Sequence, residues 1–341
     1  MAGRSVRWGI VGPGRIAEAL VGDFEYVPDA DVVAVGSRSS DRARAFADKH
    51  HIGRAYGSYR EIIADPDVDV LYIATPHPQH HAIGVQAARE GKSILVEKAF
   101  TVTHAGAQTL VDEARAHHVF AMEAMWTRFQ PAVVKARQLF ADGAIGEVRS
   151  VQADLGVVRS FDPADRIFAY ELGGGAILDL GVYVISFAQM VLGTPTSVSA
   201  HGVLEPSGVD AEASLLVGFP QGRTATLMCS LHSPMPGHAR IFGSTGWIDV
   251  LPRFHHPRSI VLHRHDAEPE RFDLPAQGAG YSHELIEVTE SIKAGRTESA
   301  IMSLDDTLAV QWVMDEALAQ LGIRFAEDKS NNLGPGRFQF D

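Results

Sequence analysis

The chain has 341 residues, which is long for one domain and suits two. Hydrophobic residues make up 45% of it and charged residues 21%, as in an ordinary globular protein. The net charge is -12 and no Lys/Arg-rich run occurs, so a general nucleic-acid-binding surface is not expected. The single cysteine, Cys229, excludes an intrachain disulfide and a zinc site built from cysteines.

No targeting or membrane segment is expected. A strand pattern begins at once at Val6, which leaves no room for the apolar core of a signal peptide. We also expect no apolar run long enough to span a bilayer, so the cytoplasm is the expected compartment.

The first 125 residues alternate short apolar runs with longer amphipathic segments. The apolar runs predict strands at Val6–Val11, Val32–Gly36, Val70–Thr75, Ser93–Glu97 and Val119–Met125. The segments between them predict helices that include Ile16–Phe24, Asp41–Lys49, His80–Glu90 and His104–His117. This alternation predicts a parallel sheet with helices on both faces, in which ligands bind beyond the carboxyl ends of the strands.

The pattern changes after residue 125. A helix is predicted at Ala132–Ala141 and ends at Gly143–Gly146. Strand-like runs follow at Val148–Val158, Thr196–Leu204, Ala211–Phe219, Thr224–His232, Ala239–Val250 and Ser259–His263, with helices at Ala176–Leu192, Ser282–Ala294 and Leu304–Leu321. Successive strands without crossover helices favour a mainly antiparallel open sheet. We predict an α/β protein with a parallel-sheet domain at 1–125, an α+β domain at 126–328 and a tail at 329–341 without assigned structure.

A glycine motif follows the first predicted strand. Gly12, Gly14 and Ala17 have the spacing Gly-x-Gly-x-x-Ala, in which the first glycine allows a tight turn and the second lets the backbone approach a pyrophosphate. The helix that begins at Arg15–Ile16 offers its free N–H groups to the phosphates. Two glycines in a turn are also compatible with a purely structural role. Because the motif opens a long strand–helix alternation, it predicts a doubly wound dinucleotide-binding (Rossmann) domain.

The end of the second predicted strand discriminates between the two nicotinamide cofactors. An NAD site usually has an acidic residue there for the ribose hydroxyls, whereas this chain has Ser37–Arg38–Ser39. A guanidinium can bind the 2′-phosphate of NADP, and no carboxylate is present to repel it. The alternative is an ordinary surface arginine; the sequence predicts NADP(H).

Two groups of residues suit proton transfer. Lys98 follows Glu97 at the carboxyl end of a predicted strand, where its ammonium can bind a substrate oxygen; an ion pair with Glu97 is the alternative. Further along, Gly173–Gly175 precede a helix that is expected to carry Asp179 and Tyr183 on one face. Tyr183 is the expected acid/base, because a nearby Lys98 cation lowers the pKa of a phenol. Asp179 would orient the substrate hydroxyl or Lys98, and a core aromatic is the alternative for Tyr183.

The set of Lys98, Asp179 and Tyr183 resembles the glucose–fructose oxidoreductase / inositol dehydrogenase (Gfo/Idh/MocA) family, and the resemblance covers nearly the whole chain. The family usually has Glu-Lys-Pro, and here Ala99 replaces that proline. Many members have histidine where Tyr183 stands. Tyrosine there is similar to the dimeric dihydrodiol dehydrogenases, the NADP-dependent D-xylose dehydrogenases and glucose–fructose oxidoreductase.

Two further segments, 75–80 and 122–129, resemble the dihydrodiol dehydrogenase subgroup, and both follow predicted strand ends. By the resemblance, His80 and Trp126 line the substrate pocket and Arg128 lies near the nicotinamide. The alternatives are a polar loop histidine and a domain-interface tryptophan. These segments complete the predicted cofactor contacts, which are Gly12, Gly14, Arg15, Ile16, Ser37, Arg38, Thr75, His77, Glu97, Lys98, Trp126 and Arg128.

The predicted pocket combines a flat apolar surface at Trp126 with several hydrogen-bonding groups. An aldopyranose and a cyclic trans-diol have the same two characters, so we expect hydride transfer between nicotinamide and a hydroxyl-bearing carbon of such a ring. A 2-hydroxy acid anchored by Arg128 is one alternative. The others are an inositol or keto-sugar dehydrogenase, and a dinucleotide-binding sensor, which would have no use for the proton-transfer residues.

No metal is expected, although the chain has 16 histidines. Their spacings match no familiar zinc signature, and adjacent pairs such as His255–His256 are expected to point apart. Hydride transfer to nicotinamide needs no metal.

Assembly follows from the second predicted sheet. Helices can cover one of its faces, and the other would stay partly apolar in a monomer, at runs such as Ala211–Phe219 and Thr224–His232. A large apolar face usually marks an interface. We therefore predict a homodimer, or a tetramer built from such dimers, through this sheet.

Overall fold

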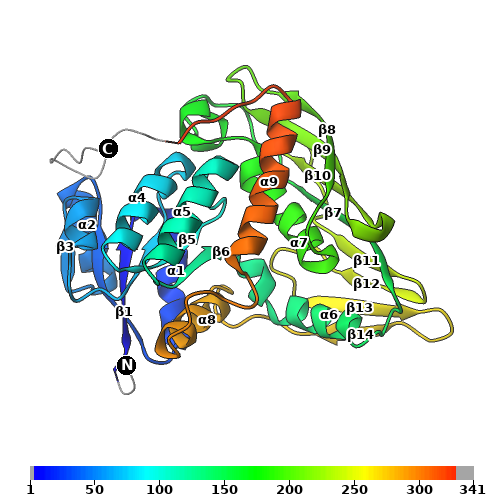
Figure 1. The fold of residues 1–341 in the computed structure, drawn as a ribbon, viewed down its shortest axis with the longest axis horizontal. Helices are drawn as coiled ribbons and strands as arrows, with labels where there is room; N and C mark the ends of the chain where they lie inside the picture. The colour runs from blue at the N-terminus through cyan, green and yellow to red at the C-terminus, as the bar shows by residue number, and fades with distance from the viewer. Residues whose placement is uncertain (1–3, 328–341) are drawn as a thin grey trace. The chain divides into compact units, whose positions relative to one another are not determined.

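The computed structural model describes residues 4–327, which divide into two compact units (Figure 1). Within the described residues, unit 1 comprises 4–124, 277–304 and 326–327, and unit 2 comprises 125–276 and 305–325. The predicted boundary near residue 125 matches the first division. The later division differs from the prediction, which assigned all of 126–328 to the second domain. The predicted tail, 329–341, lies outside the described residues.

Unit 1 contains the predicted parallel sheet, in the order β3-β2-β1-β4-β5-β6. Its strands are β1 (Val6–Val11), β2 (Ala30–Gly36), β3 (Arg54–Tyr56), β4 (Val70–Ile73), β5 (Ser93–Glu97) and β6 (Ala121–Ala124). All five pairings are parallel. The strand order reverses between β1 and β4, which is where doubly wound sheets bind their ligands. The predicted Rossmann architecture is therefore confirmed.

The helices of unit 1 are α1 (Arg15–Gly22), η1 (Asp23–Tyr26), α2 (Ser40–His50), α3 (Tyr59–Ile63), α4 (His77–Arg89), α5 (His104–Ala116) and α8 (Ser282–Lys293). Side-chain oxygens of Ser39, Ser58 and Thr103 cap α2, α3 and α5 by accepting backbone N–H groups of the first turn. The sequence pattern missed β3 and α3. They contain three and five residues, too few for a periodicity to show.

One buried carboxylate explains why α8 belongs to unit 1 although it lies far along the chain. Asp23, directly after α1, accepts the backbone N–H groups of Ala279 and Tyr281 at 2.7 Å and of Ser282 at 3.0 Å. These donors lie at the start of α8, where a helix has N–H groups without intrahelical partners. Asp23 is a remote cap that binds this helix to the Rossmann sheet.

Unit 2 contains an eight-stranded sheet in the order β14-β13-β12-β11-β7-β10-β9-β8. Its strands are β7 (Val148–Gly156), β8 (Ser197–Leu204), β9 (Asp210–Gly218), β10 (Thr224–Ser230), β11 (Ala239–Gly243), β12 (Gly246–Val250), β13 (Ser259–Arg264) and β14 (Glu270–Asp273). Only β7 and β10 pair in parallel, so the predicted mainly antiparallel sheet is confirmed. The predicted single run Ala239–Val250 is a hairpin of two strands, and the short β14 was missed.

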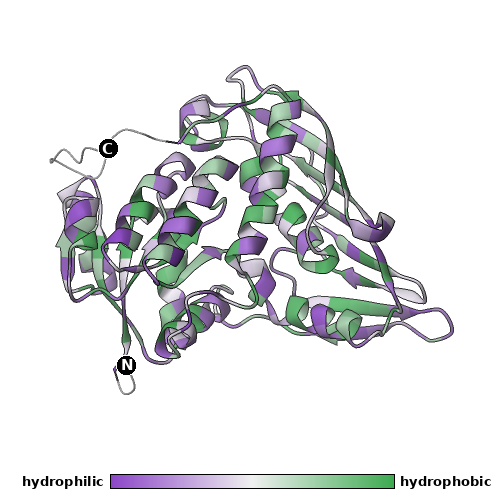
Figure 2. Cartoon of the chain, in the orientation of Figure 1, coloured by the Kyte–Doolittle hydropathy of each residue, from purple (hydrophilic) through white to green (hydrophobic). Residues whose placement is uncertain are grey.

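Helices of unit 2 cover one face of this sheet. The helical segments of the unit are η2 (Trp126–Phe129), α6 (Pro131–Ala141), η3 (Arg166–Phe168), η4 (Tyr170–Leu172), the π-helical η5 (Ile177–Gly181), α7 (Val182–Leu192), η6 (Pro220–Gly222) and α9 (Leu304–Gln320). Helix α7 packs on β7 and β10, and α6 packs on β12 and β13. Hydrophobic residues run along α7 and the strands (Figure 2). Leu227 and Cys229 point into this core, whereas Thr226 and Met228, which alternate with them along β10, are exposed.

The stretch Tyr170–Leu192 is apolar and long enough to cross a membrane, which corrects the expectation that no such run exists. In the structure, 89% of its apolar window is buried within the protein. A core helix of a globular domain passes the same test of length and composition.

We predict that Asp23→Ala lowers the free energy of unfolding by about 3 kcal/mol, because three backbone N–H groups lose a charged acceptor. Urea unfolding measures this difference. Asp48→Ala, an exposed position on α2, is the matched control and should change stability by less than about 0.5 kcal/mol. Equal midpoints for both variants would contradict the role of Asp23 as a cap.

Candidate active site

The turn between β1 and α1 has the form of a phosphate cradle. Gly12 has φ +90°, and a Cβ there would lie 3.0 Å from the carbonyl oxygen of Ala74, so only glycine fits. A Cβ on Gly14 would meet open space, which leaves room for a ligand against the backbone. No side chain caps α1. The Thr75 side chain lies next to Gly12, and its buried Oγ1 has no hydrogen-bond partner among the described residues. These free donors fit a dinucleotide pyrophosphate.

The end of β2 presents the predicted serines and arginine. Ser37 is buried, and its Oγ accepts the N–H of Ser39 at 3.2 Å. Arg38 is exposed and lies beside Tyr59. Burial raises the pKa of the Tyr59 phenol, and the neighbouring Arg38 cation opposes that rise. The strand end therefore offers an exposed guanidinium on a backbone held by Ser37.

The backbone that carries Lys98 is held by the carboxylate of Glu97. The Tyr72 hydroxyl donates to Glu97 Oε1, and the backbone N–H of Lys98 donates to Glu97 Oε2 at 3.2 Å. Burial and the Glu97 charge raise the pKa of Tyr72, which keeps this phenol protonated as a donor. Lys98 itself is half-buried, and its peptide bond to Ala99 is cis.

A second buried acid in unit 1, Glu284, was not found from the sequence. It lies in the first turn of α8, and neither of its carboxyl oxygens has a hydrogen-bond partner among the described residues. Burial, together with the Glu97 charge, raises the pKa of Glu284 well above its ordinary value. The only sequence signal is an acid at an otherwise apolar helical position.

His80 is buried within unit 1, and its predicted place on the pocket wall stays a prediction. It is 0% exposed, with Nε2 2.7 Å from the carbonyl oxygen of Thr75 and Nδ1 3.0 Å from that of Ala99. His77, at the start of α4, places its ring edge-on to that of His80. The His80 ring thus ties α4 to the segments that follow β4 and β5, because those two carbonyl oxygens belong to these segments.

In unit 2, the glycine-rich turn before α7 is required by close packing. Gly175 has φ +110°, and a Cβ there would lie 2.2 Å from Oδ1 of Asp210. A Cβ on Gly174 would lie 2.5 Å from the carbonyl oxygen of Ile167. That same carbonyl accepts the N–H of Gly175 at 2.8 Å. The turn is therefore locked against the loop that contains η3.

Asp210, at the start of β9, anchors the helix that follows the turn. Its Oδ2 accepts the N–H of Ile177 at 2.6 Å. Burial raises the pKa of Asp210 to about 7, and the backbone N–H donors act in the opposite direction. The sequence analysis did not single out Asp210, because its partner lies 33 residues away along the chain.

Asp179 and Tyr183 do not lie on one continuous α-helix as predicted. Asp179 is in the π turn η5, and Tyr183 is in the first turn of α7. Single π turns inside helices are frequent at functional sites. Asp179 Oδ1 accepts a hydrogen bond from Nη2 of Arg166 at 2.9 Å, so the carboxylate is paired with a half-exposed cation that the sequence analysis missed.

The Tyr183 phenol lies in an aromatic cluster. Trp126 Nε1 donates to the Tyr183 hydroxyl at 3.2 Å, and the His255 ring packs 5.2 Å from the Tyr183 ring. His256 stacks on Trp126 at 5.5 Å, and burial lowers the pKa of its imidazole. The rings of His255 and His256 are 4.4 Å apart and perpendicular, and both contact Trp126. The prediction that this pair points apart was wrong, because the loop turns both rings toward η2.

Arg128 is buried and forms hydrogen bonds to several elements of unit 2. Its Nε donates to Ser186 Oγ at 3.0 Å, and its Nη1 donates to Asp306 Oδ2 at 2.9 Å. Its Nη2 donates to the Ser186 carbonyl and to Gln189. These contacts join η2 to α7 and α9. The predicted place of Arg128 beside the nicotinamide, and the 2-hydroxy acid alternative that depends on it, stay predictions.

Among residues 4–327, no group of three or more His, Cys, Asp or Glu side chains is arranged to hold a metal ion. Cys229, the single cysteine of the chain, is buried in the core of unit 2, with its Sγ next to Gly181.

Comparisons with known proteins cover both units. Residues 6–125 match the family described as "Oxidoreductase family, NAD-binding Rossmann fold", and residues 133–249 match the "GFO/IDH/MocA C-terminal domain". Among curated proteins, trans-1,2-dihydrobenzene-1,2-diol dehydrogenase of Xenopus tropicalis is 37% identical over 333 residues, with 94% of this chain and 99% of the relative covered.

Two solved structures illustrate the likeness of fold. Aldose-aldose oxidoreductase from Caulobacter crescentus, complexed with glycerol, has a TM-score of 0.85 at 25% identity, over 94% of this chain and 98% of the other. A 3-ketoreductase from Actinomadura kijaniata, in complex with NADP and TDP-benzene, has a TM-score of 0.81 at 26% identity, over 93% and 98%.

Proposed function

The chain belongs to the Gfo/Idh/MocA family of oxidoreductases, and we propose that it is an NADP-dependent dehydrogenase for an aldopyranose or a cyclic trans-diol. The observation that carries the proposal is the environment of Tyr183, a phenol buried against Trp126 and His255 on a helix whose start is anchored by Asp210. The relatives named for a dihydrobenzenediol and for aldoses support the substrate class.

The proposed reaction consists of a proton transfer and a hydride transfer. A bound nicotinamide cofactor supplies the hydride chemistry. Tyr183 accepts the proton of the substrate hydroxyl while the carbon–hydrogen bond breaks and the carbonyl forms. The Lys98 ammonium assists by stabilising the phenolate. Asp179, paired with Arg166, accepts a hydrogen bond from a substrate hydroxyl.

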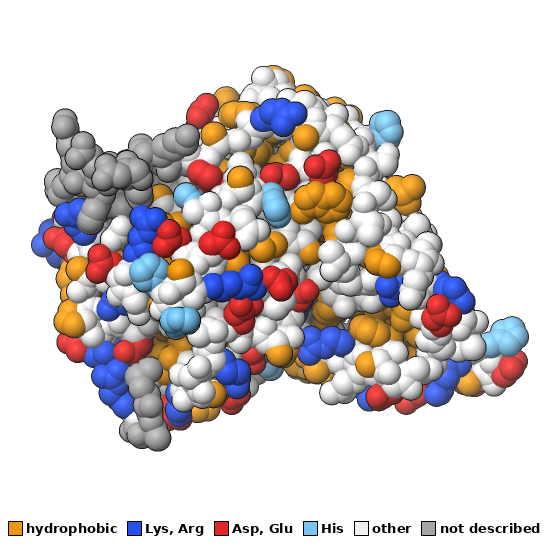
Figure 3. All heavy atoms as spheres, viewed as in Figure 1, with side chains coloured by type: hydrophobic (Ala, Val, Ile, Leu, Met, Phe, Trp, Pro, Cys, Tyr) orange, Lys and Arg blue, Asp and Glu red, His pale blue; other side chains and the backbone are white. Residues whose placement is uncertain are grey.

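The substrate class fits the side chains around Tyr183. Trp126 and the His255–His256 pair form an aromatic wall, and the C–H face of a pyranose or cyclic diol packs on such a surface. Asp179 and Arg166 add charged hydrogen-bonding groups for hydroxyls. On the face drawn in Figure 3, acidic and basic side chains are interspersed, which favours a small-molecule partner over a nucleic acid.

We predict that Tyr183→Phe lowers kcat at least about a hundredfold, because the acid/base is lost while the cofactor cradle is intact. NADPH affinity, followed by nucleotide fluorescence, should change less than about twofold. The substrate panel should contain aldopyranoses, cyclic trans-diols, inositols, keto-sugars and short hydroxy acids. Activity on short acyclic hydroxy acids alone would refute the substrate class, and nucleotide binding without turnover of any substrate would favour a sensor.

We predict a preference for NADP over NAD, because the end of β2 offers Ser37 and an exposed Arg38 and has no carboxylate. Arg38→Ala should reduce kcat/KM for NADP by about tenfold or more and leave that for NAD within about twofold, since only NADP has the 2′-phosphate. Arg42→Ala, another exposed arginine in the next turn, is the control. Equal kcat/KM for the two cofactors in the unmodified protein would contradict the assignment.

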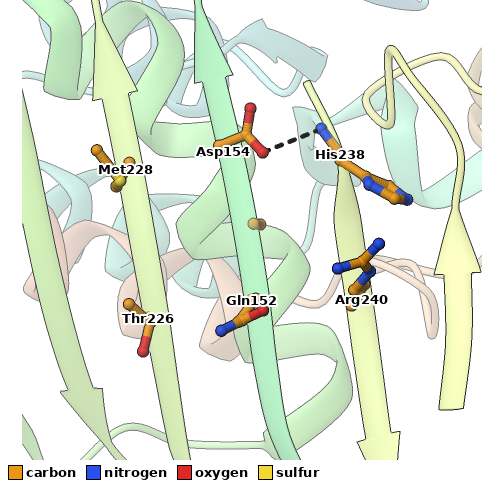
Figure 4. A pocket seen from close by; sticks show the side chains of 7 residues that line it. Gln152, Asp154, Thr226, Met228, His238 and Arg240 are labelled. Carbon is orange, nitrogen blue, oxygen red and sulfur yellow. Dashed lines mark hydrogen bonds between the residues drawn. The ribbon is translucent and has the colours of Figure 1, made fainter. Parts of the chain in front are cut away.

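We also propose that the protein is a homodimer, or a dimer of dimers, through the uncovered face of the eight-stranded sheet. Figure 4 shows Gln152, Asp154, Thr226, Met228, His238 and Arg240 lining a hollow across β7, β10 and the start of β11. Apolar side chains are exposed on the sheet, with Leu216 53%, Met228 38% and Trp247 38% accessible. Such a face is suited to a self-complementary contact.

Light scattering at micromolar concentration is expected to give at least the dimer mass. Met228→Glu should shift the protein toward the monomer by at least about tenfold in the dissociation constant, because two copies of the new charge would be buried near the twofold axis. Ala141→Glu, at the exposed end of α6, should leave the mass unchanged. A monomer mass for the unmodified protein would rule out this assembly.

A further inference from the structure

The hydrogen bond between Trp126 and Tyr183 has a direction that the chemistry of the indole group decides. An indole nitrogen carries a hydrogen and has no lone pair to offer, so it is a donor only. The Tyr183 oxygen, 3.2 Å from Trp126 Nε1, must therefore be the acceptor in both of its protonation states. The hydroxyl hydrogen of Tyr183 cannot point at Trp126 and must be directed elsewhere.

The strength of this hydrogen bond differs between the two protonation states of Tyr183. A hydrogen bond to an ionised acceptor is about twice as strong as one to a neutral acceptor. The indole N–H therefore stabilises the phenolate more than the phenol. This effect arises inside unit 2, so it is present whether or not Lys98 contributes.

We propose that Trp126 is a positioning residue for Tyr183, whose indole N–H stabilises the phenolate and directs the phenol hydrogen toward the substrate oxygen. The inference rests on the proposed function, in which Tyr183 exchanges a proton with the substrate hydroxyl. In oxidation, the substrate O–H bond would break and a new O–H bond would form on Tyr183, and a bound nicotinamide would supply the hydride acceptor. Trp126 keeps its own hydrogen throughout and acts only through Tyr183.

The indole is held in place from several sides, which a tuning role requires. Its backbone carbonyl accepts a hydrogen bond from Gln130 Nε2 at 3.2 Å, and His256 stacks on its ring. The next residue, Thr127, donates to the carbonyl oxygen of His255 at 2.7 Å. These contacts tie η2 to the His255–His256 loop and fix the direction of the N–H.

Other titratable groups of unit 2 near Tyr183 must be separated from the effect of Trp126. His255 packs against the Tyr183 ring, and His256 stacks on Trp126. On the preceding turn, Asp179 is paired with Arg166. A variant that removes only the indole N–H leaves all four of these groups in place, so a change in the titration of Tyr183 reports on the hydrogen bond.

The first experiment compares pH profiles of kcat/KM for alcohol oxidation in the unmodified protein and in Trp126→Phe. Phenylalanine keeps an aromatic surface and removes the donor. The pH at which the active phenolate appears should rise by about one unit, so the rate near neutral pH should fall about tenfold. KM should change less than about threefold, because the stacking surface remains. Trp312→Phe, half-buried on α9, is the matched control and should leave the profile unchanged.

An isosteric replacement separates the hydrogen bond from packing. Incorporation of 3-benzothienylalanine at position 126 keeps the shape of the bicyclic ring and puts sulfur where the N–H was. The same upward shift is expected. If Trp126→Phe shifts the profile and the isostere does not, the effect comes from packing and the inference is wrong.

A readout without substrate keeps the inference distinct from the proposed function. Tyrosinate absorbance in the ultraviolet, taken as the difference between a protein and its Tyr183→Phe counterpart, gives the titration of Tyr183 alone. That titration should move to higher pH in Trp126→Phe. If Tyr183→Phe retains full activity, the proposed acid/base fails whatever Trp126 does. If Tyr183→Phe is inactive and the titration does not move in Trp126→Phe, only the role of Trp126 fails.

Discussion

The placement of the helix that carries Tyr183 depends on one buried carboxylate. Asp210 lies on β9 in the core of unit 2 and accepts the N–H of Ile177, the first residue of the π turn. Its Oδ1 occupies the space that a Cβ on Gly175 would need, so the glycine and the acid require each other. The π turn carries Asp179, and the α-helix that continues from it carries Tyr183. A helix start without this acceptor would leave an N–H group buried and unsatisfied.

The same device recurs at other functional segments. Glu97 accepts the N–H of Lys98, Glu123 accepts that of Phe100 at 3.2 Å, and Asp23 accepts three N–H groups before α8. Each carboxylate is buried and accepts at least one backbone N–H group. Backbone donors hold a carboxylate with fixed geometry, because the peptide plane cannot rotate as a lysine or arginine side chain can. The reactive side chains can therefore project from backbone that is itself rigid.

Polar residues that a sequence offers as site candidates differ in what their side chains contact in the folded protein. His80 and Arg128 have their polar atoms engaged by the protein itself, by two carbonyl oxygens and by a set of α7 and α9 acceptors. Such buried polar networks hold segments in register, because each group needs every partner to offset its lost hydration. His255 and His256, by contrast, lie with Trp126 around the Tyr183 phenol, where their rings form a wall.

The sequence by itself determined the parallel and antiparallel sheets, the glycine cradle after β1 and the candidates Lys98, Asp179 and Tyr183. These features are encoded locally, in the alternation of apolar residues and in glycines whose backbone geometry no other residue tolerates. Only the tertiary structure decided that α8 joins the Rossmann unit, that Ala239–Val250 is a hairpin, and that Asp210, Arg166 and His255 serve the Tyr183 helix. The places of α8 and of the residues around the Tyr183 helix depend on hydrogen bonds or ring contacts between residues at least 13 apart in the chain, and the two hairpin strands are also held by pairing with β7 and β13. No local pattern records such a contact, because its geometry exists only after both segments have folded.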